Sequence, residues 1–353
     1  MAYQSFLSLT PKSVREYLFP PTKFMGSKQA ILPFMFGHLD KLEYETVLDA
    51  FSGSNCVAYE FKRKGKSVTT NDFLHFSYVL SKAVIENNKA RIDDETFSEL
   101  LRIRDDAPRF VRDTYSYLFF TYAECYFLDS LWANIQEIED EYLRCLAIAA
   151  ACRACQKKRP RGIFTFTGRK SWDGRRDLKL SIQAQFAKAI QLFNDAIFDN
   201  GKKHRANWSD IMSFKDNDFD LVYIDPPYWT PYSDNDYVRR YHFIEGYSRY
   251  WENLTVDMNT KTRKFRSYKS MFSRRESATK ALTELFSRYS SSIIALSYSS
   301  NGYPTKEELL AMLRKVKKHV EVYETDYRYS FANQRNRVGK IKNKVKEYLF
   351  IGM

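Results

Sequence analysis

Residues 41–72 read KLEYETVLDAFSGSNCVAYEFKRKGKSVTTND, and this stretch decides the fold class. The apolar run Thr46–Ala50 predicts a buried strand, which a short glycine-bearing loop follows. Residues 55–65 carry their apolar side chains at helical spacing and end on a glycine, so they predict a helix. Residues 67–72 predict a second strand. The order strand, helix, strand is typical of a parallel sheet in an α/β protein.

Polar residues follow the predicted strands where each strand ends. The second strand closes on Asn71 and Asp72, and the buried run 220–224 (DLVYI) is followed directly by Asp225. The carboxyl ends of parallel strands form the edge at which open α/β sheets bind ligands. We therefore expect a binding site at this edge.

Asp225-Pro226-Pro227-Tyr228 is the strongest local motif. A proline has no N–H and a fixed φ, so two in a row cannot continue a central strand. The strand should stop here, with the carbonyls of Asp225 and Pro226 directed outward. Together with the Asp225 carboxylate they can accept both hydrogens of an exocyclic amine, and Tyr228 offers a ring on which a planar base can stack. The alternative is a turn without function.

The middle of the chain is mostly helical in pattern, and strands return after it. Residues 94–106, 122–155 and 180–198 have helical periodicity, whereas 292–296, 320–331 and 345–352 predict strands. We expect one α/β domain split in sequence, residues 1–84 and 205–353, with a helical basic domain inserted at 85–204.

Composition indicates a folded chain with a polyanionic partner. Of 353 residues 44% are apolar and 16% aromatic, which excludes collagen-like and disordered classes. No apolar run is long enough to span a membrane, and residues 1–13 lack an export-signal pattern, so we expect a soluble, cytoplasmic protein. The net charge of +13 favours DNA, RNA or a membrane surface without choosing among them.

The positive charge is concentrated in two blocks. Residues 151–206 hold 14 Lys and Arg against four Asp, and residues 261–275 hold seven against no acid. Aromatic residues are interleaved with these cations: Phe164, Phe166, Trp172, Phe265, Tyr268 and Phe272. The combination predicts surfaces that follow a nucleic-acid backbone, with solvated loops as the alternative.

The five cysteines do not form a disulfide framework, because their number is odd. Cys152 and Cys155 have CxxC spacing within an alanine-rich helical stretch, and no second cysteine pair or suitably spaced histidines complete a zinc site. We expect half-buried thiols, with metal or redox chemistry as the alternative.

Three motifs in a fixed order give the chain a family resemblance. Lys23–Lys28, then Phe51-Ser52-Gly53-Ser54, then Asp225–Tyr228 resemble the D12 class of DNA N6-adenine methyltransferases. The resemblance covers about residues 20–85 and 205–350. It implies a Rossmann-like S-adenosylmethionine-dependent methyltransferase fold with an inserted, mainly helical target-recognition domain. It also implies methyl transfer to N6 of a flipped adenine in double-stranded DNA, in a restriction-modification or Dam-like context, with a cognate restriction endonuclease as a further partner.

The resemblance assigns roles to individual residues. The catalytic set is Asp225, Pro226, Pro227 and Tyr228. The set that binds S-adenosylmethionine, with no metal required, is Gly26, Lys28, Asp49, Phe51, Ser52, Gly53, Ser54, Asp72, Asp210 and Asp225. Within it Asp72 matches the acid for the ribose hydroxyls, and Asp210 the acid for the adenine amine of the cofactor. Asn55 stands where the family usually has a second glycine, and asparagine tolerates the positive φ this position requires.

Target recognition falls to the inserted domain in this reading. The candidates for guanine-edge or phosphate contacts are Arg159, Arg161, Arg169, Arg175 and Arg176. Tyr298 matches a wall of the target pocket, and residues 229–240 are expected to fold over the flipped base.

Two alternatives stay open. An RNA N6-adenine methyltransferase would use the same chemistry, although the basic insertion between the second strand and Asp225 favours DNA. A nucleic-acid-binding protein without activity could keep the same fold. Enzymes that methylate protein glutamine usually begin this motif with Asn, so Asp225 argues against them.

Overall fold

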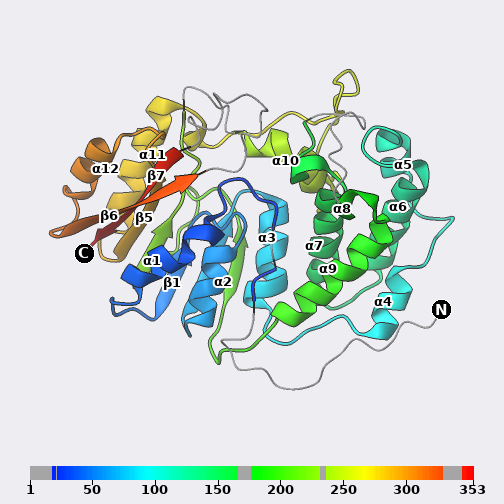
Figure 1. The fold of residues 1–353 in the computed structure, drawn as a ribbon, viewed down its shortest axis with the longest axis horizontal. Helices are drawn as coiled ribbons and strands as arrows, with labels where there is room; N and C mark the ends of the chain where they lie inside the picture. The colour runs from blue at the N-terminus through cyan, green and yellow to red at the C-terminus, as the bar shows by residue number, and fades with distance from the viewer. Residues whose placement is uncertain (1–17, 21, 166–175, 231–235, 329–343) are drawn as a thin grey trace. The chain divides into compact units, whose positions relative to one another are not determined.

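Among the residues that the computed structural model describes (18–20, 22–165, 176–230, 236–328 and 344–353), one seven-stranded sheet forms the centre of the fold. Its strands in chain order are β1 (Thr46–Asp49), β2 (Ser67–Asp72), β3 (Arg205–Trp208), β4 (Leu221–Ile224), β5 (Ile293–Ser299), β6 (Val320–Arg328) and β7 (Lys344–Gly352). The spatial order is β3-β2-β1-β4-β5-β7-β6 (Figure 1). Strands β1 to β5 are parallel, and β7 lies antiparallel between β5 and β6.

The α/β methyltransferase fold predicted from the sequence is confirmed, while the inserted helical target-recognition domain stays a prediction. One strand, β3, was not predicted, and this has a physical explanation. Strands form at every position where the sequence predicted one: at 46–50, 67–72, 220–224 and 292–296 and in the two tail segments. Strand β3 escaped prediction because it is four residues long, reads RANW and is only partly buried at the sheet edge. Such a segment carries neither an apolar run nor a clear alternation.

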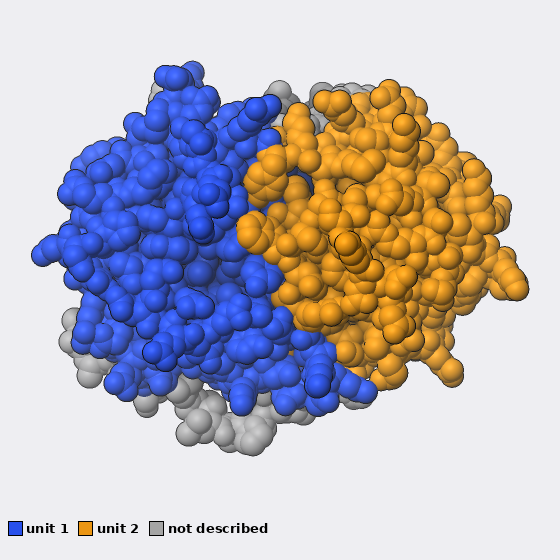
Figure 2. Space-filling view, turned by 180° about the vertical axis from the view of Figure 1, so that it is seen from behind, with its two compact units in different colours: residues 1–24, 74–204, 237–267 blue, residues 25–73, 205–236, 268–353 orange. Residues whose placement is uncertain are grey.

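The chain divides into two compact units, coloured separately in Figure 2. The sheet unit comprises residues 25–73, 205–236 and 268–353, and the helical unit comprises the described residues of 1–24, 74–204 and 237–267. By packing, residues 74–84 and 237–267 therefore belong with the helices, beyond the predicted boundaries at 84 and 205. The assignment of the parts to catalysis and target recognition stays a prediction.

Helices cover both faces of the sheet. Leu48 and Val222 point to the face covered by α11 and α12, where Leu282 joins the same apolar cluster. On the other face Phe61 packs edge-on against Tyr223, with ring centroids 6.3 Å apart. The helices of this unit are η2 (Lys28–Ile31), α1 (Leu32–Leu39), α2 (Cys56–Arg63), η5 (Met271–Ser273), α11 (Arg275–Arg288) and α12 (Lys306–Leu313). This two-sided burial explains why the central strand β4 is apolar on both sides.

A buried aspartate organises the helical unit. The Asp129 carboxylate of α6 accepts hydrogen bonds from the backbone N–H groups of Val111 and Arg112 and lies 3.2 Å from the Arg112 guanidinium. It thereby joins α5 to α6. The helices of this unit are α3 (His75–Ser81), η3 (Lys82–Glu86), α4 (Asp94–Leu100), α5 (Phe110–Tyr115), α6 (Tyr122–Gln136), α7 (Glu141–Lys157), η4 (Pro160–Gly162), α8 (Arg176–Lys179), α9 (Ile182–Ala196) and α10 (Tyr237–Tyr247). No helix in the described part of the chain has the length and apolarity of a membrane span.

The cysteines are free thiols, all buried. Cys152 and Cys155 lie inside α7, more deeply than the half-buried positions expected, and burial raises the pKa of both thiols. Within the described ranges no cluster of three or more His, Cys, Asp or Glu side chains is arranged to hold a metal ion.

Candidate functional site

The strand order reverses between β1 and β4, and the candidate site lies at that point. From β1 the chain proceeds outward through β2 and β3, whereas β4 starts the opposite half of the sheet. Asp49 is the last residue of β1, and Asp225 directly follows β4. The register pairs Asp49 with Tyr223, so the two acids belong to adjacent strand ends. A switch point of this kind is where open α/β sheets bind ligands.

The two prolines end β4 as predicted, and Asp225 stands at the resulting edge. Its side chain is 19% exposed, and Oδ1 lies 3.2 Å from Nζ of Lys28. Burial raises the pKa of Asp225 to about 6; Lys28 acts to lower it and Glu347 to raise it. Above that pH the carboxylate is ionised and can accept hydrogen bonds.

Glu347, which the sequence analysis did not identify, is the second partner of Lys28. Its Oε2 lies 3.2 Å from the same Nζ, and its side chain is 2% exposed. A signal was present in the sequence: in β7 the inward positions alternate as Val345, Glu347, Leu349 and Ile351. A carboxylate at a position where the alternation requires an apolar residue marks a buried charge that needs a partner.

The glycine loop after β1 folds back onto the end of β2. Gly53 has φ +45°, and its N–H donates to the Asp72 carboxylate over 2.7 Å. Asn55 has φ +64°, which confirms that it can stand in for the second glycine of the family motif. The Ser54 hydroxyl donates to Ser27 Oγ over 3.2 Å, and Ser27 directly precedes Lys28. The three motifs that were far apart in sequence are therefore neighbours.

Asp49 is buried at the head of this loop. Burial raises the pKa of Asp49 well above its ordinary value, and the negative charges of Asp225 and Asp72 act in the same direction. Its Oδ1 is buried and accepts no hydrogen bond from the described residues. A buried acceptor without a donor is what a polar or cationic ligand would satisfy.

The remaining predicted cofactor residues lie around the same strand ends. Asp210 follows β3, and its carboxylate accepts from Met212 N over 2.9 Å. Its neighbour Ser209 donates its N–H to the Asp72 carbonyl, so this segment is fixed beside the end of β2. Phe51 packs edge-on against Phe272, and Gly26 turns the chain with φ +76° just before Lys28. All of these residues belong to the sheet unit; their ligand contacts stay predictions.

Tyr228 is supported by a wall that includes Tyr298. The two ring centroids are 5.2 Å apart, and Lys28 Nζ lies 5.9 Å from the Tyr228 centroid. The loop after β5 is tied to this wall, because Tyr303 N donates to the Trp229 carbonyl over 3.0 Å. A Cβ at Gly302 would lie 2.8 Å from a Tyr298 ring carbon and 2.9 Å from a Tyr228 ring carbon. Only glycine leaves both rings in place.

Of the predicted DNA contacts, Arg159 requires a correction. It is 1% exposed, lies 5.0 Å from the Phe119 ring centroid and donates to the Phe119 carbonyl. Its guanidinium is engaged inside the helical unit, so it does not present a base or phosphate contact. Arg176 is exposed at the start of α8. Arg169, Arg175 and the side chain of Arg161 lie outside what the structure describes.

The interleaved aromatic residues are mostly core residues rather than stacking surfaces. Phe164, Phe265 and Phe272 are each no more than 5% exposed, whereas the nearby Lys261 and Arg266 are exposed. Tyr268 is partly buried, and its ring packs edge-on against Phe73. Most cations of residues 261–275 thus face solvent while the phenylalanines face inward; Arg263 is partly buried and donates to the Thr114 carbonyl. Phe166 and Trp172, like residues 231–235 of the expected cover over the base, lie outside the described residues.

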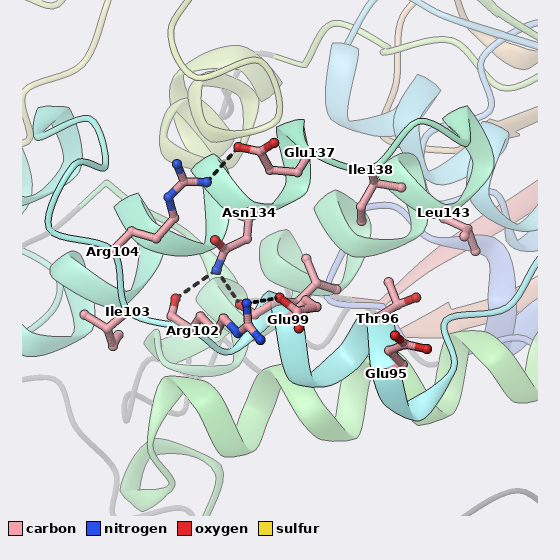
Figure 3. Close-up of a pocket in the computed structure, with 11 residues that line it drawn as sticks. Glu95, Thr96, Glu99, Arg102, Ile103, Arg104, Asn134, Glu137, Ile138 and Leu143 are labelled. Atoms are coloured by element: carbon pink, nitrogen blue, oxygen red, sulfur yellow. Dashed lines mark hydrogen bonds and ion pairs between the residues drawn. The ribbon is translucent and has the colours of Figure 1, made fainter.

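A cavity of about 630 Å³ in the helical unit is distinct from this site (Figure 3). Four of its charged side chains form two pairs: Arg104 with Glu137 at 2.8 Å and Arg102 with Glu99 at 2.6 Å. Asn134 donates to the carbonyl of Arg102 across its wall. The cavity lining includes none of the predicted catalytic or cofactor residues.

Comparisons with known proteins agree on the family that this chain resembles. Residues 24–312 match the family described as D12 class N6 adenine-specific DNA methyltransferase. The chain is 29% identical to the type II methyltransferase M2.HphI of Haemophilus parahaemolyticus, over 94% of this chain and 97% of that protein. It is 30% identical to modification methylase StsI of Streptococcus sanguinis, over 83% of this chain and 46% of that protein. It is 26% identical to the type II methyltransferase M.FokI of Planomicrobium okeanokoites, over 93% of this chain and 52% of that protein. The chain thus spans nearly all of the first relative and about half of the other two.

Proposed function

The chain belongs to the D12 class of N6 adenine-specific DNA methyltransferases, and from this premise we propose that the edge around Asp49, Lys28 and Asp225 transfers a methyl group from S-adenosylmethionine to N6 of an adenine flipped out of duplex DNA. The family predicted from the sequence is confirmed, and the chain is a site-specific DNA adenine methyltransferase. The relatives' names support a role in restriction-modification. We further propose a cognate endonuclease as partner and host DNA in the cytoplasm as substrate.

The residues present fit S-adenosylmethionine. The buried Asp49 Oδ1 lacks a donor, and a cationic ligand at this edge would offset the charge of the neighbouring carboxylates. The Gly53 turn lets the backbone approach a ligand closely. Asp72 and Asp210, at the ends of β2 and β3, offer carboxylates for the ribose hydroxyls and the adenine amine. When bound, the cofactor supplies a methyl group on a positively charged sulfur.

The Asp225 carboxylate and the Pro226 carbonyl are the acceptors that orient the target amine. The N6 lone pair is delocalised into the purine ring, and two hydrogen bonds from the amine favour a tetrahedral nitrogen whose lone pair faces the methyl carbon. With S-adenosylmethionine bound, the amine nitrogen would bond to the methyl carbon as the sulfur–carbon bond breaks, and the cationic amine would then lose a proton to the Asp225 carboxylate or to water. Asp225 serves as an orienting acceptor rather than as a base that acts first. Such positioning can contribute up to about 7–11 kcal/mol.

Tyr228 provides the stacking surface for the flipped base. Flipping costs a few kcal/mol of lost pairing and stacking. Stacking on an aromatic ring returns about 1–3 kcal/mol. Tyr298 and the glycine at position 302 keep the Tyr228 ring in one orientation. Of the described arginine candidates, Arg176 is exposed and remains proposed as a DNA contact.

One observation carries this proposal: the Asp225 motif, the Lys28 motif and the glycine loop meet at the switch point of the sheet. The test is transfer of labelled methyl groups to unmethylated duplex DNA and, in parallel, to structured RNA. We expect transfer to the duplex alone. Efficient transfer to RNA instead would favour the RNA methyltransferase alternative.

Asp225→Ala separates the catalytic role from cofactor binding. We expect it to lower transfer by at least about a thousandfold, because the amine loses its orienting acceptor. The affinity for S-adenosylmethionine, measured by calorimetry, should change little. Asp218→Ala, an exposed aspartate of the loop before β4, is the matched control. Transfer at the wild-type rate by Asp225→Ala would overturn the assignment.

A further inference from the structure

The ammonium of Lys28 is held between two carboxylates, one directly after β4 and one within β7. Nζ lies 3.2 Å from Asp225 Oδ1 and 3.2 Å from Glu347 Oε2, so the two acids lie within twice that distance of each other. The side chains of Lys28 and Glu347 are 5% and 2% exposed, against 19% for Asp225. Glu347 therefore stands behind the cation, while Asp225 stands at the edge that substrate reaches.

Strand β7 fixes Glu347 in this place. In the antiparallel registers it is opposite Ser299 of β5 on one side and Thr325 of β6 on the other. Its inward neighbours Val345 and Leu349 are buried apolar residues. A carboxylate is strongly disfavoured out of water unless a cation compensates its charge, so Glu347 at this position requires Lys28. The buried Glu347 carboxylate is linked to Asp225 through Lys28. A buried charge so close to the proposed site of reaction suggests a functional role.

We propose that Glu347 is a positioning residue for methyl transfer: it holds the Lys28 ammonium against Asp225 and sets the balance of charge at the acceptor. The proposal rests on the proposed function, since it assigns Asp225 the role of acceptor for the amine. It adds a residue of the last strand pair, which no motif of the sequence identified, to the groups that prepare the site.

The charges around Lys28 and Asp225 predict in which direction Glu347 changes the pKa of Asp225. Asp49 of β1 and Glu347 of β7 add negative charge near Asp225, Lys28 adds positive charge, and the hydroxyl of Tyr223 on β4 faces the same region. Tyr327 of β6 interacts electrostatically with both Lys28 and Glu347, and Cys56 of α2 and Asp72 of β2 each interact with Asp49. Because Glu347 acts to raise the pKa of Asp225, removing only its charge should lower that pKa.

Glu347→Gln isolates the charge, because its amide oxygen still accepts a hydrogen bond from Lys28. The matched control is Glu324→Gln, which removes a carboxylate of β6 that pairs with Lys306 and Lys346 at the surface. Single-turnover transfer from labelled S-adenosylmethionine to unmethylated plasmid DNA is measured from about pH 5 to about pH 8. We expect the acid limb of the profile to move down by about one pH unit in Glu347→Gln. We expect no movement in Glu324→Gln, and cofactor affinity by calorimetry should be unchanged in both variants.

Two further readouts separate positioning from a merely structural role. The Asp225 carboxyl, followed by carbon-13 NMR in the free enzyme, should titrate at lower pH in Glu347→Gln than in wild type. Glu347→Ala, which also removes the acceptor for Lys28, should lower the plateau rate about tenfold or more, and Glu347→Gln should recover most of it. If Glu347→Ala does not fold, the glutamine variant decides the question.

The outcomes that would overturn the inference differ from those that would overturn the proposed function. An unchanged acid limb and unchanged Asp225 titration in Glu347→Gln would show that Glu347 does not act on the acceptor. Loss of transfer in proportion to loss of cofactor binding would show a general structural role. Wild-type enzyme that methylates no DNA would refute the proposed function, while the titration of Asp225 would still test its coupling to Glu347.

Discussion

At the scale of single residues, the site depends on one cation among several carboxylates. Among the described residues, Lys28 is the basic side chain within ion-pair distance of Asp225, and it also forms an ion pair with Glu347. Asp49 and Asp72 add further negative charge on the glycine-loop side. The protonation of Asp225 therefore depends on which charges its neighbours carry, and single substitutions can shift it in either direction.

The first prediction at this scale concerns Lys28. Because the pKa of Asp225 is raised to about 6, wild-type transfer should increase as the pH rises through about 6, where the carboxylate becomes ionised. Lys28→Met removes the charge that lowers this pKa, so the acid limb should move up by about one to three pH units. Lys28→Arg keeps the charge and should stay closer to wild type. Single-turnover transfer rates measured against pH test this prediction. An acid limb of the Lys28→Met profile at the same pH as in wild type would contradict it.

Gly302 gives a steric prediction. In Gly302→Ala the new Cβ would lie 2.8 Å from Tyr298 and 2.9 Å from Tyr228, so the Tyr228 ring must shift. We expect the transfer rate to fall about tenfold to a hundredfold with unchanged cofactor affinity, because a small displacement of the stacking surface misaligns the base. Gly37→Ala in α1, where no atom lies within 4 Å of the new Cβ, is the control and should keep wild-type activity. Equal rates for the two variants would argue against a role for the ring position.

At the scale of elements, apolar strands and strand-end motifs were predictable, whereas features set by partners far along the chain were not. Strands β1 and β4 were predictable from short apolar runs, because strands buried on both faces have continuous apolar sequence. Strand β2 (SVTTND) was predictable from its place in the order strand, helix, strand. The role of Glu347 was not predicted because it depends on an ion pair with Lys28, which is 319 residues away in sequence. The helical pattern at 122–155 did not reveal the break between α6 and α7.

That break yields a stability prediction. Asp140 is the N-cap of α7, and its carboxylate accepts from the N–H groups of Tyr142 and Leu143. Asp140→Ala leaves both donors without this partner and should destabilise the fold by about 1 kcal/mol. Urea unfolding followed by circular dichroism measures the change, with the exposed Asp218→Ala as the reference. A midpoint for Asp140→Ala equal to that of Asp218→Ala would rule out a capping role.

At the scale of the whole molecule, packing and sequence order divide the chain differently. Residues 237–267 follow the Asp225 motif in sequence but pack in the helical unit, where the Cys152 thiol of α7 donates to the Ile244 carbonyl of α10. The sequence predicted an α/β unit and a helical unit, but it did not predict that residues 237–267 would pack with the helical unit. The cause is physical: residues 241–247 of α10 are buried without interruption, and nothing local specifies which core they join.

Net charge gives the prediction that belongs to the molecule as a whole. With +13 charges, the enzyme should bind any duplex with an affinity that falls steeply with salt, since each phosphate contact contributes about 0.9 to the slope of log affinity against log salt. If residues 261–275 contact the backbone, Lys261→Ala with Arg266→Ala should reduce that slope by about two. Lys315→Ala with Lys318→Ala removes the same charge from exposed positions after α12 and should leave the slope unchanged. Fluorescence anisotropy with a labelled duplex, from about 50 to about 200 mM salt, measures both. Equal losses in the two double variants would mean that total charge, rather than the surface of residues 261–275, holds the DNA.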